Sequence, residues 1–129
     1  MKQLILDIVI NRPLEAVFDY VIDPSHSPDW IDSFKKEEAA PWPPRIGTLY
    51  RNCNHQGDWT EYRVEAFKPP RHFGIAQVGG DYHAEYLLSS PAPDTTKLIY
   101  HEWVTSGELA DHFPSAALEK LKRNLEAAA

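Results

Sequence analysis

One acidic residue stands out in the sequence as a candidate for acid–base chemistry. Glu102 lies in a segment rich in apolar and aromatic residues, and in a β-strand it would share a face with Tyr100 and Val104. A carboxyl group in an apolar cavity is costly to ionise unless it is paired or hydrated, and such a group can act as a general acid or base. Glu102 is therefore the candidate catalytic residue. An ion pair, or a position at the open end of a sheet, would explain the same residue without chemistry.

Aromatic residues with polar groups are the candidates for ligand binding. Tyrosine rings can pack against a ligand while their hydroxyl groups hydrogen-bond it, although aromatic residues also favour strands for packing alone. Trp30 closes a turn-rich segment, and we expect it to be mostly buried against the C-terminal helix or at a cavity mouth. The candidate ligand-binding residues are Trp30, Tyr50, Tyr62, Tyr82, Tyr86 and Tyr100.

Alternation along two neighbouring strands suggests which side chains face inward. Residues 82–89 and 95–105 each have a more apolar face, which should lie toward the core. A hairpin centred on residues 91–93 would pair Tyr86 with Leu98 and Tyr82 with Glu102. The same register would place His83 near His101 on the outer face.

Other kinds of site find little support in the sequence. Zinc sites show close ligand spacing or cysteine ligands, whereas the nearest pairs here are His83-x-Glu85 and His101-Glu102, so we expect no metal and no cofactor. Cys53 has no histidine or aspartate nearby in the sequence and is interpreted as a small strand residue. No Gly-x-Ser-x-Gly motif is present, and Gly79-Gly80 is interpreted as a turn. The six histidines are His26, His55, His72, His83, His101 and His112.

Composition sets the class of protein. The 129 residues have a net charge of −6, with 43% hydrophobic and 25% charged residues, which is typical of one globular domain spanning residues 1–129. The acidic balance and scattered basic residues disfavour nucleic-acid binding. One cysteine, no signal-peptide pattern and no apolar run long enough for a membrane span favour a cytoplasmic location. A homodimer is possible but nothing indicates one.

The order of elements predicts an α+β fold. Residues 4–10 predict a strand, and Pro13 then opens a helix with Asn11 as a possible cap. That helix ends at residues 23–24, and residues 25–30 predict a turn or helical turn. A final helix follows Pro114 and Ser115, with an apolar stripe of Leu118, Leu121, Leu125 and Ala128. Between these helices the sequence predicts a weak edge strand at 33–39 and strands at 48–54, 58–67, 72–78, 82–89 and 95–105.

The strand at residues 58–67 has two possible registers. Tyr62 and Val64 favour one inward face, whereas Trp59 and Phe67 favour the other. A β-bulge would reconcile both. Short connections between the strands indicate an antiparallel meander, in which a curved sheet packs against the helices and leaves a cavity.

Several fragments in this order resemble a known superfamily. The sequence is similar to the START-like or SRPBCC superfamily, which includes the birch-pollen-allergen-like proteins, and in particular to its polyketide cyclase/dehydrase and lipid-transport branch. The fragments are Pro13-x-Glu15-x-Val17-Phe18, Tyr20-Val21-x-Asp23, Pro28-x-Trp30, Ile46-Gly47-Thr48, Val64-Glu65-Ala66-Phe67-Lys68-Pro69-Pro70-Arg71, Thr96-x-Leu98 and Leu121-Lys122.

The resemblance implies a helix-grip fold, in which about six or seven antiparallel strands and two short helices after the first strand wrap around a long C-terminal helix. It implies a cavity between the sheet and that helix. Two functions follow as alternatives. One is binding of a small hydrophobic ligand, aromatic, polyketide-like or lipid-like. The other is a cyclase or dehydratase in which Glu102 and tyrosines supply acid–base catalysis.

Overall fold

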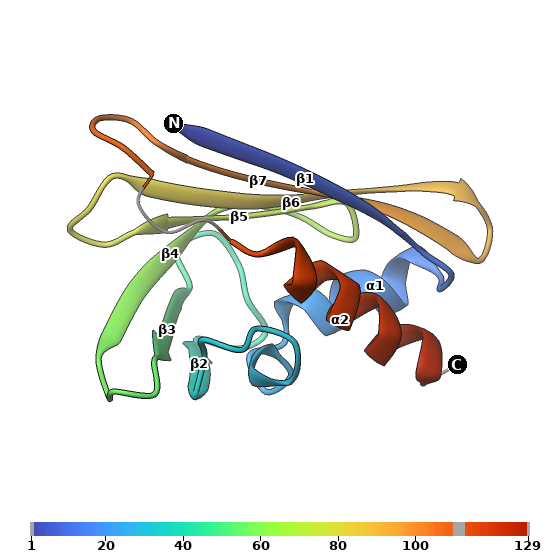
Figure 1. The fold of residues 1–129 in the computed structure, drawn as a ribbon, viewed down its shortest axis with the longest axis horizontal. Coiled ribbons are helices and arrows are strands. Elements are labelled where there is room, and N and C mark those ends of the chain that lie inside the picture. The colour runs from blue at the N-terminus through green and yellow to red at the C-terminus, as the bar shows by residue number, and fades with distance from the viewer. Residues whose placement is uncertain (1, 110–112, 129) are drawn as a thin grey trace.

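A computed structural model describes residues 2–109 and 113–128. Seven strands, two α-helices and one short 3-10 helix make up this part of the chain (Figure 1). The strands are β1 (Gln3–Ile10), β2 (Lys36–Ala40), β3 (Leu49–Cys53), β4 (Trp59–Lys68), β5 (His72–Gln77), β6 (Tyr82–Ala92) and β7 (Thr95–Val104). The helices are α1 (Leu14–Ile22), η1 (Ser27–Asp29) and α2 (Ser115–Ala127).

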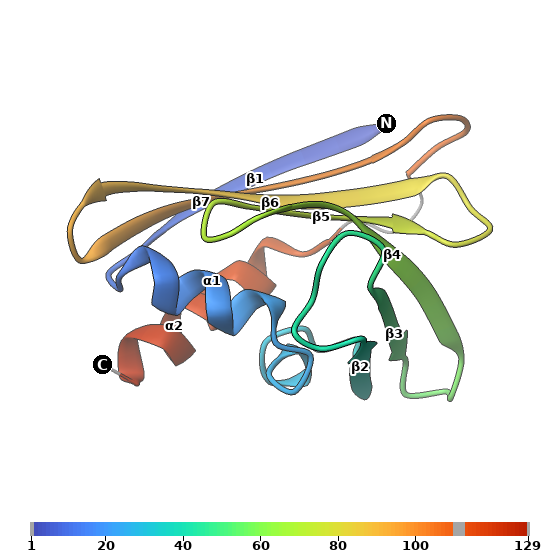
Figure 2. The same ribbon diagram turned by 180° about the vertical axis from the view of Figure 1, so that it is seen from behind.

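The strands form one antiparallel sheet in the order β1-β7-β6-β5-β4-β3-β2. Strands β2 to β7 follow one another as a meander, and β1 adds to the far edge beside β7. Figures 1 and 2 show β1, β7, β6 and β5 as an upper layer, while β4 bends down toward β3 and β2. Both α-helices lie on the concave side. This arrangement confirms the α+β helix-grip fold, with β2 as the expected edge strand.

The helices differ in detail from the expectation. The second helix after β1 is a single 3-10 turn of three residues, and α2 has 13 residues. Helix α1 buries Leu14, Val17, Phe18 and Val21, as its spacing predicts. Asn11 does not cap α1, because Pro13 occupies the N-cap position and no side chain caps the helix. The backbone N–H of Asn11 instead donates to the carboxylate of Glu126 in α2.

Helix α2 turns its apolar stripe toward the sheet. Leu118, Leu121 and Leu125 are buried, joined by Ala117. Ala128 lies beyond the last helical residue and is exposed, so the predicted stripe ends one turn earlier. The possible helical turn at residues 107–113 and His112 fall partly or wholly outside the described residues.

The predicted bulge in β4 is present. The pairing of β4 with β5 shifts between Val64 and Ala66, and one extra residue there changes which side chains face inward. Val64 is buried, and Tyr62 and Phe67 both pack against the core. Trp59, before the bulge, is exposed. Both apolar patterns of this segment therefore reach the same core.

The predicted register of β6 with β7 is wrong by two residues. Tyr86 lies opposite Tyr100, and Ala84 lies opposite Glu102. Strand β6 runs further than expected, to Ala92, whereas β7 begins at Thr95 as expected, which moves the turn toward the C-terminus. An even shift leaves every side chain on its predicted face, because the side-chain period of a strand is two.

The same shift changes the outer face of the sheet. Trp103, not His101, lies opposite His83, and its indole stacks against both imidazole rings. His101 instead lies opposite Glu85, with its Nδ1 3.0 Å from that carboxylate. The expected contact between the two histidines is therefore replaced by an aromatic ring between them.

Candidate functional site

A cavity of about 120 Å³ lies on the concave side of the sheet. Nine of the 17 described residues that line it are aromatic, and all six aromatic candidates from the sequence are among them. The wall consists of Val21, Ser27, Trp30, Ile31, Ser33, Phe34, Glu37, Tyr50, Asn52, Tyr62, Phe73, Ile75, Tyr82, Ala84, Tyr86, Tyr100 and Phe113.

We expected the C-terminal helix to form the side of the cavity opposite the sheet, but other segments form it. Residues from α1, η1 and the segment that follows them cover it, together with Phe113 just before α2. Ala117 of α2 lines a neighbouring groove of about 600 Å³ instead. No described residue of α2 forms the cavity wall. Helix α2 thus supports the segment from Val21 to Phe34, which covers the cavity.

Trp30 lies at the centre of this covering segment. Its side chain is 1% exposed and meets the rings of Tyr86 and Phe113 edge-on, at centroid distances of 6.3 Å and 6.0 Å. The structure therefore confirms that Trp30 is buried at the cavity. Its indole N–H is buried and has no hydrogen-bond partner among the described residues. Such a buried donor without a partner is costly.

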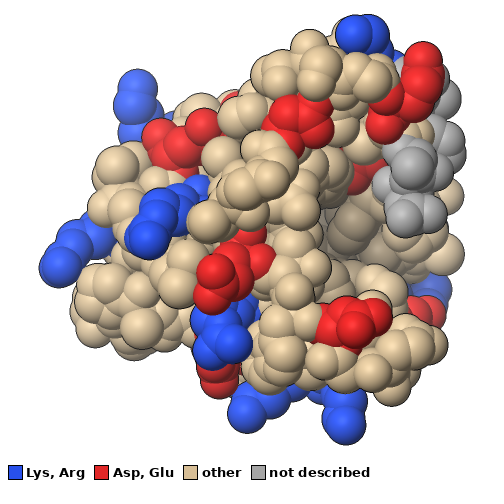
Figure 3. Space-filling model, turned by 90° about the vertical axis from the view of Figure 1, so that its left-hand side faces the viewer, with Lys and Arg blue, Asp and Glu red and all other residues tan. Residues whose placement is uncertain are grey.

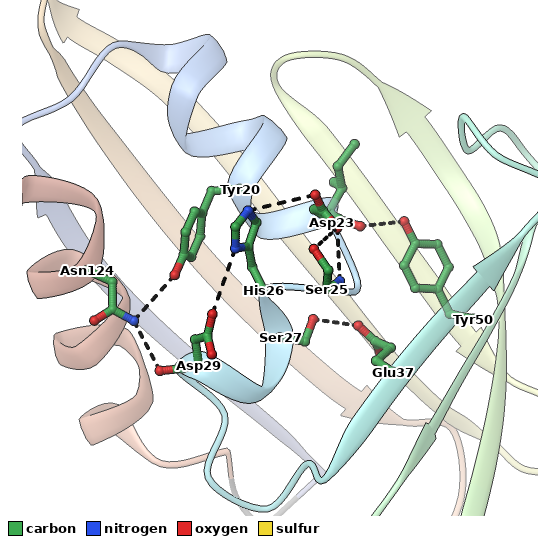
Figure 4. A network of polar contacts seen from close by, with 10 residues as sticks. Tyr20, Asp23, Ser25, His26, Ser27, Asp29, Glu37, Tyr50 and Asn124 are labelled. Carbon is green, nitrogen blue, oxygen red and sulfur yellow. Dashed lines mark hydrogen bonds and ion pairs between the residues drawn. The ribbon is translucent and has the colours of Figure 1, made fainter. Parts of the chain in front are cut away.

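Tyr50 joins the sheet to α1. It lies in β3, and its hydroxyl donates to the backbone carbonyl of Ile22 over 2.7 Å, as Figure 4 shows. Its ring packs edge-on against Phe73 at 5.3 Å. Tyr50 thus contributes a ring to the cavity wall while its hydroxyl is already engaged.

Glu102 is the centre of a buried polar cluster. The hydroxyls of Tyr82 and Tyr100 donate to its Oε1 over 2.6 Å and 2.8 Å, and the N–H of Phe113 donates to Oε2 over 3.1 Å. The two phenol oxygens are 2.9 Å apart. Glu102 is 1% exposed, so the prediction of an inward-facing carboxyl group is confirmed.

Glu102 does not line the inner cavity. It lines an adjoining groove of about 430 Å³, which shares Ser33, Tyr62, Tyr82 and Phe113 with the cavity. Since three donors already point at its two oxygens, Glu102 also holds Tyr82 and Tyr100 in place.

Sequence reasoning missed a second buried carboxyl group, Glu37. It lies in β2 and accepts hydrogen bonds from Ser27 Oγ at 2.5 Å and, more weakly, from Asn52 Nδ2 at 3.4 Å. Figure 4 shows the first of these contacts between η1 and β2. Burial raises the pKa of Glu37 to about 7, against the lowering effect of these two bonds. A carboxyl group with this pKa can exchange a proton near neutral pH.

The sequence did hold a signal for Glu37. Residues 35–38 are all charged, which is typical of a strand at the edge of a sheet. Alternation along β2, however, places Glu37 on the face opposite Lys36 and Glu38, which pair with each other outside. Ala39, on the same face as Glu37, packs against the core.

Burial also keeps the tyrosine hydroxyls neutral. It is the largest cause that raises the pKa of Tyr62, Tyr82, Tyr86 and Tyr100, and the nearby carboxylates add to it. These phenols therefore act as neutral donors and acceptors around the cavity.

No three histidine, cysteine or acidic side chains in the described part of the chain are placed to share a metal ion. Cys53 is buried at the end of β3. Within residues 2–109 and 113–128, neither helix has the length and apolar character needed to cross a membrane.

Comparison with known proteins agrees with the fold. A family model described as "Polyketide cyclase / dehydrase and lipid transport" matches residues 2–129. The chain belongs to this family, which is of the SRPBCC type. Membership supports a role in hydrophobic ligand binding or in cyclisation. A search of curated proteins found no match.

Solved structures show the same fold at low sequence identity. The chain is similar to the protein XoxI from Bacillus cereus, with 15% identity, a TM-score of 0.78, and coverage of 99% of this chain and 98% of that one. It is similar to the di-domain ARO/CYC BexL from the BE-7585A biosynthetic pathway, with 14% identity, a TM-score of 0.72, and coverage of 98% and 47%. It is also similar to the Aha1 dimer from Colwellia psychrerythraea, with 14% identity, a TM-score of 0.73, and coverage of 98% and 97%.

Proposed function

We propose that the protein binds a small aromatic ligand in the cavity between the sheet and the segment that α2 supports. The observation that carries this proposal is the cavity itself, which nine aromatic side chains surround. Rings pack well against rings, and burying one removes a large apolar area from water. Trp30, Tyr62, Tyr82, Tyr86 and Tyr100 are the proposed ligand contacts, with Tyr50 as part of the wall.

The size of the cavity restricts the ligand. An apolar cavity of about 150 Å³ is enough to hold benzene. The volume of about 120 Å³ therefore suits a single ring. A longer polyketide-like or lipid-like molecule would place one ring here and extend into the adjoining groove of about 430 Å³.

An NMR titration with benzyl alcohol tests this proposal. We expect the indole N–H resonance of Trp30, assigned by Trp30→Phe, to shift on binding because the Trp30 side chain lines the cavity. Ala84→Leu, which fills the cavity, should weaken binding at least tenfold. Ala76→Leu, on the other face of the sheet, is the matched control.

No shift at Trp30 at millimolar benzyl alcohol would overturn the proposal. Equal binding by the Ala84→Leu variant, shown to be folded by its NMR spectrum, would place the ligand elsewhere and overturn it as well. Native mass spectrometry of protein purified from its own host would then identify the ligand.

A second candidate function is cyclisation or dehydration of a polyketide-like substrate. The cluster of Glu102, Tyr82 and Tyr100 favours it, because it places a carboxyl group and two phenols where the cavity meets the groove. In this function Glu102 would act as acid or base. Conversion of a bound poly-β-ketone to a product one water lighter, lost in Glu102→Gln, would support it, whereas recovery of the unchanged compound would favour binding alone.

A further inference from the structure

The walls of the cavity and its adjoining grooves carry acidic groups without basic ones. Glu37 is the one charged side chain among the described residues of the cavity wall. Asp81 and Glu102 line one groove, and Asp32 and Asp58 line the other. Among the described residues, no lysine, arginine or histidine contributes to any of these three walls. Figure 3 shows a hollow at this end of the molecule with acidic side chains beside it.

This charge pattern selects against anions. A carboxylate or phosphate ligand would enter a chamber where the fixed charges repel it, with no described basic side chain in the wall to pair with. The lining therefore suits a ligand that is neutral or positively charged.

The aromatic lining adds a specific preference for a cation. The faces of tryptophan, tyrosine and phenylalanine rings are negative and attract ammonium groups, most strongly where water is excluded. Glu37 lies in the wall of this cavity. Among the described residues, only the neutral side chains of Ser27 and Asn52 donate hydrogen bonds to it. An ammonium group beside Glu37 would be paired with a carboxylate and surrounded by rings.

We propose that the ligand is an arylalkylamine of one ring, with its amino group on an alkyl carbon, whose ammonium group pairs with Glu37 while its ring packs among the cavity aromatics. This inference rests on the proposed function and narrows its ligand class. Glu37 acts as the specificity-determining residue. Glu102, with three donors already on its oxygens, is not the partner of the amine.

The pairing makes affinity depend on pH. Besides Glu37, the titratable groups that face it are the phenols of Tyr50, Tyr62 and Tyr86, and burial keeps all three neutral. An alkylammonium group stays protonated through neutral pH. Because the pKa of Glu37 is about 7, its ionised fraction rises about tenfold from pH 6 to pH 8. Amine affinity should rise by about the same factor.

Three probes of equal size provide the test. Benzylamine, benzyl alcohol and benzoate carry one ring each and differ in charge. Titrations at pH 6 and pH 8 should show benzylamine binding at least tenfold tighter than benzyl alcohol at pH 8, and no measurable benzoate binding.

Glu37→Gln should abolish the preference for benzylamine and its pH dependence, while benzyl alcohol still binds. Glu38→Gln is the matched control, because Glu38 lies on the same strand but pairs with Arg51 on the other face. Glu38→Gln should leave the preference for benzylamine and the pH dependence of its binding unchanged. The pH dependence of the wild-type protein needs no variant and stands as an independent measurement.

Benzyl alcohol binding as tightly as benzylamine at pH 8 would overturn this inference and leave the proposed function intact. Benzylamine binding that is unchanged in Glu37→Gln, or that does not change with pH, would overturn it too. Failure of all three probes to bind would overturn the proposed function itself.

Discussion

Glu37 and Glu102 show how different surroundings assign different roles to two buried carboxyl groups. Three donors point at Glu102, so its oxygens are well satisfied and it orders Tyr82 and Tyr100. Glu37 has one short bond and one long bond, from Ser27 and Asn52. Burial without full compensation favours the neutral form of a carboxyl group. Glu37 is therefore the residue whose protonation responds to pH and to a ligand.

Titration of Glu37 should change the free energy of unfolding of the protein. Its pKa is raised from 4.5 to about 7 in the folded protein, so the folded state holds this proton more tightly than the unfolded state. The resulting stabilisation is present below pH 4.5 and is lost as the pH rises through 7. Relative to Glu37→Gln, we expect the free energy of unfolding of the wild type to fall by about 3 kcal/mol between pH 4.5 and pH 8. Urea denaturation across this range measures it.

The comparison with Glu37→Gln removes the contributions of all other titrating groups. Glu38→Gln should follow the wild-type curve, because Glu38 is partly exposed and paired outside the cavity. The prediction would be contradicted if the free energies of unfolding of the wild type and Glu37→Gln changed with pH by the same amount.

At the scale of elements, the turn after β1 holds the end of α2. Arg12 Nη1 donates to the carbonyl of Leu125 over 2.6 Å, and the N–H of Asn11 donates to Glu126 over 2.8 Å. The last carbonyls of a helix have no partner within it, so a side chain from elsewhere in the chain can satisfy them. Thr96 Oγ1 in turn donates to the carbonyl of Arg12. These bonds tie β7, the turn and α2 together.

Arg12→Ala should lower the free energy of unfolding by about 1.5–3 kcal/mol, because it removes a charged donor and leaves a helix carbonyl without its partner. Chemical denaturation measures this change. Arg123→Ala, in the exposed face of α2, should cost less than about 0.5 kcal/mol. An Arg12 variant as stable as the Arg123 variant would show that the bond does not hold the helix.

Element order could be predicted from the sequence, whereas register could not. Residues 82–89 and 95–105 have clear period-two patterns, so their faces were predicted correctly. The pattern does not say which of two registers two residues apart is formed, because both keep the same faces inward. In the structure β6 extends to Ala92, which pairs with Thr95, and the ladder shifts between Ser89 and Ala92.

At the scale of the molecule, the curved sheet and the segment from α1 to β2 enclose the cavity together. Neither surface is closed alone, so the cavity exists only in the folded state. A ligand that binds there stabilises the folded protein by mass action. The sheet bends at β4 toward β3 and β2 (Figure 2), and Tyr50 and Tyr62 line the same cavity as Tyr82 and Tyr86.

Benzyl alcohol at ten times its dissociation constant should therefore stabilise the protein by about 1.4 kcal/mol. For a chain of this length we expect the melting temperature to rise by several degrees. Differential scanning calorimetry measures the shift. Ala84→Leu should show a smaller shift at the same concentration, and Ala76→Leu the full one. A wild type without a shift, although NMR shows binding, would mean that the ligand also binds the unfolded chain.

The sequence alone was enough to predict the order of the elements, the inward faces of β6 and β7 and six of the nine aromatic residues around the cavity. These follow from local periodicity, because alternation and helical spacing record which side chains must be buried. The β6–β7 register, the cavity wall opposite the sheet and the hydrogen-bond partners of Glu37 are set by the tertiary structure alone. These depend on contacts between segments such as Ser27 with Glu37 and Glu37 with Asn52, which no local pattern specifies. Burial in turn sets the pKa of Glu37, and with it the chemistry of the site.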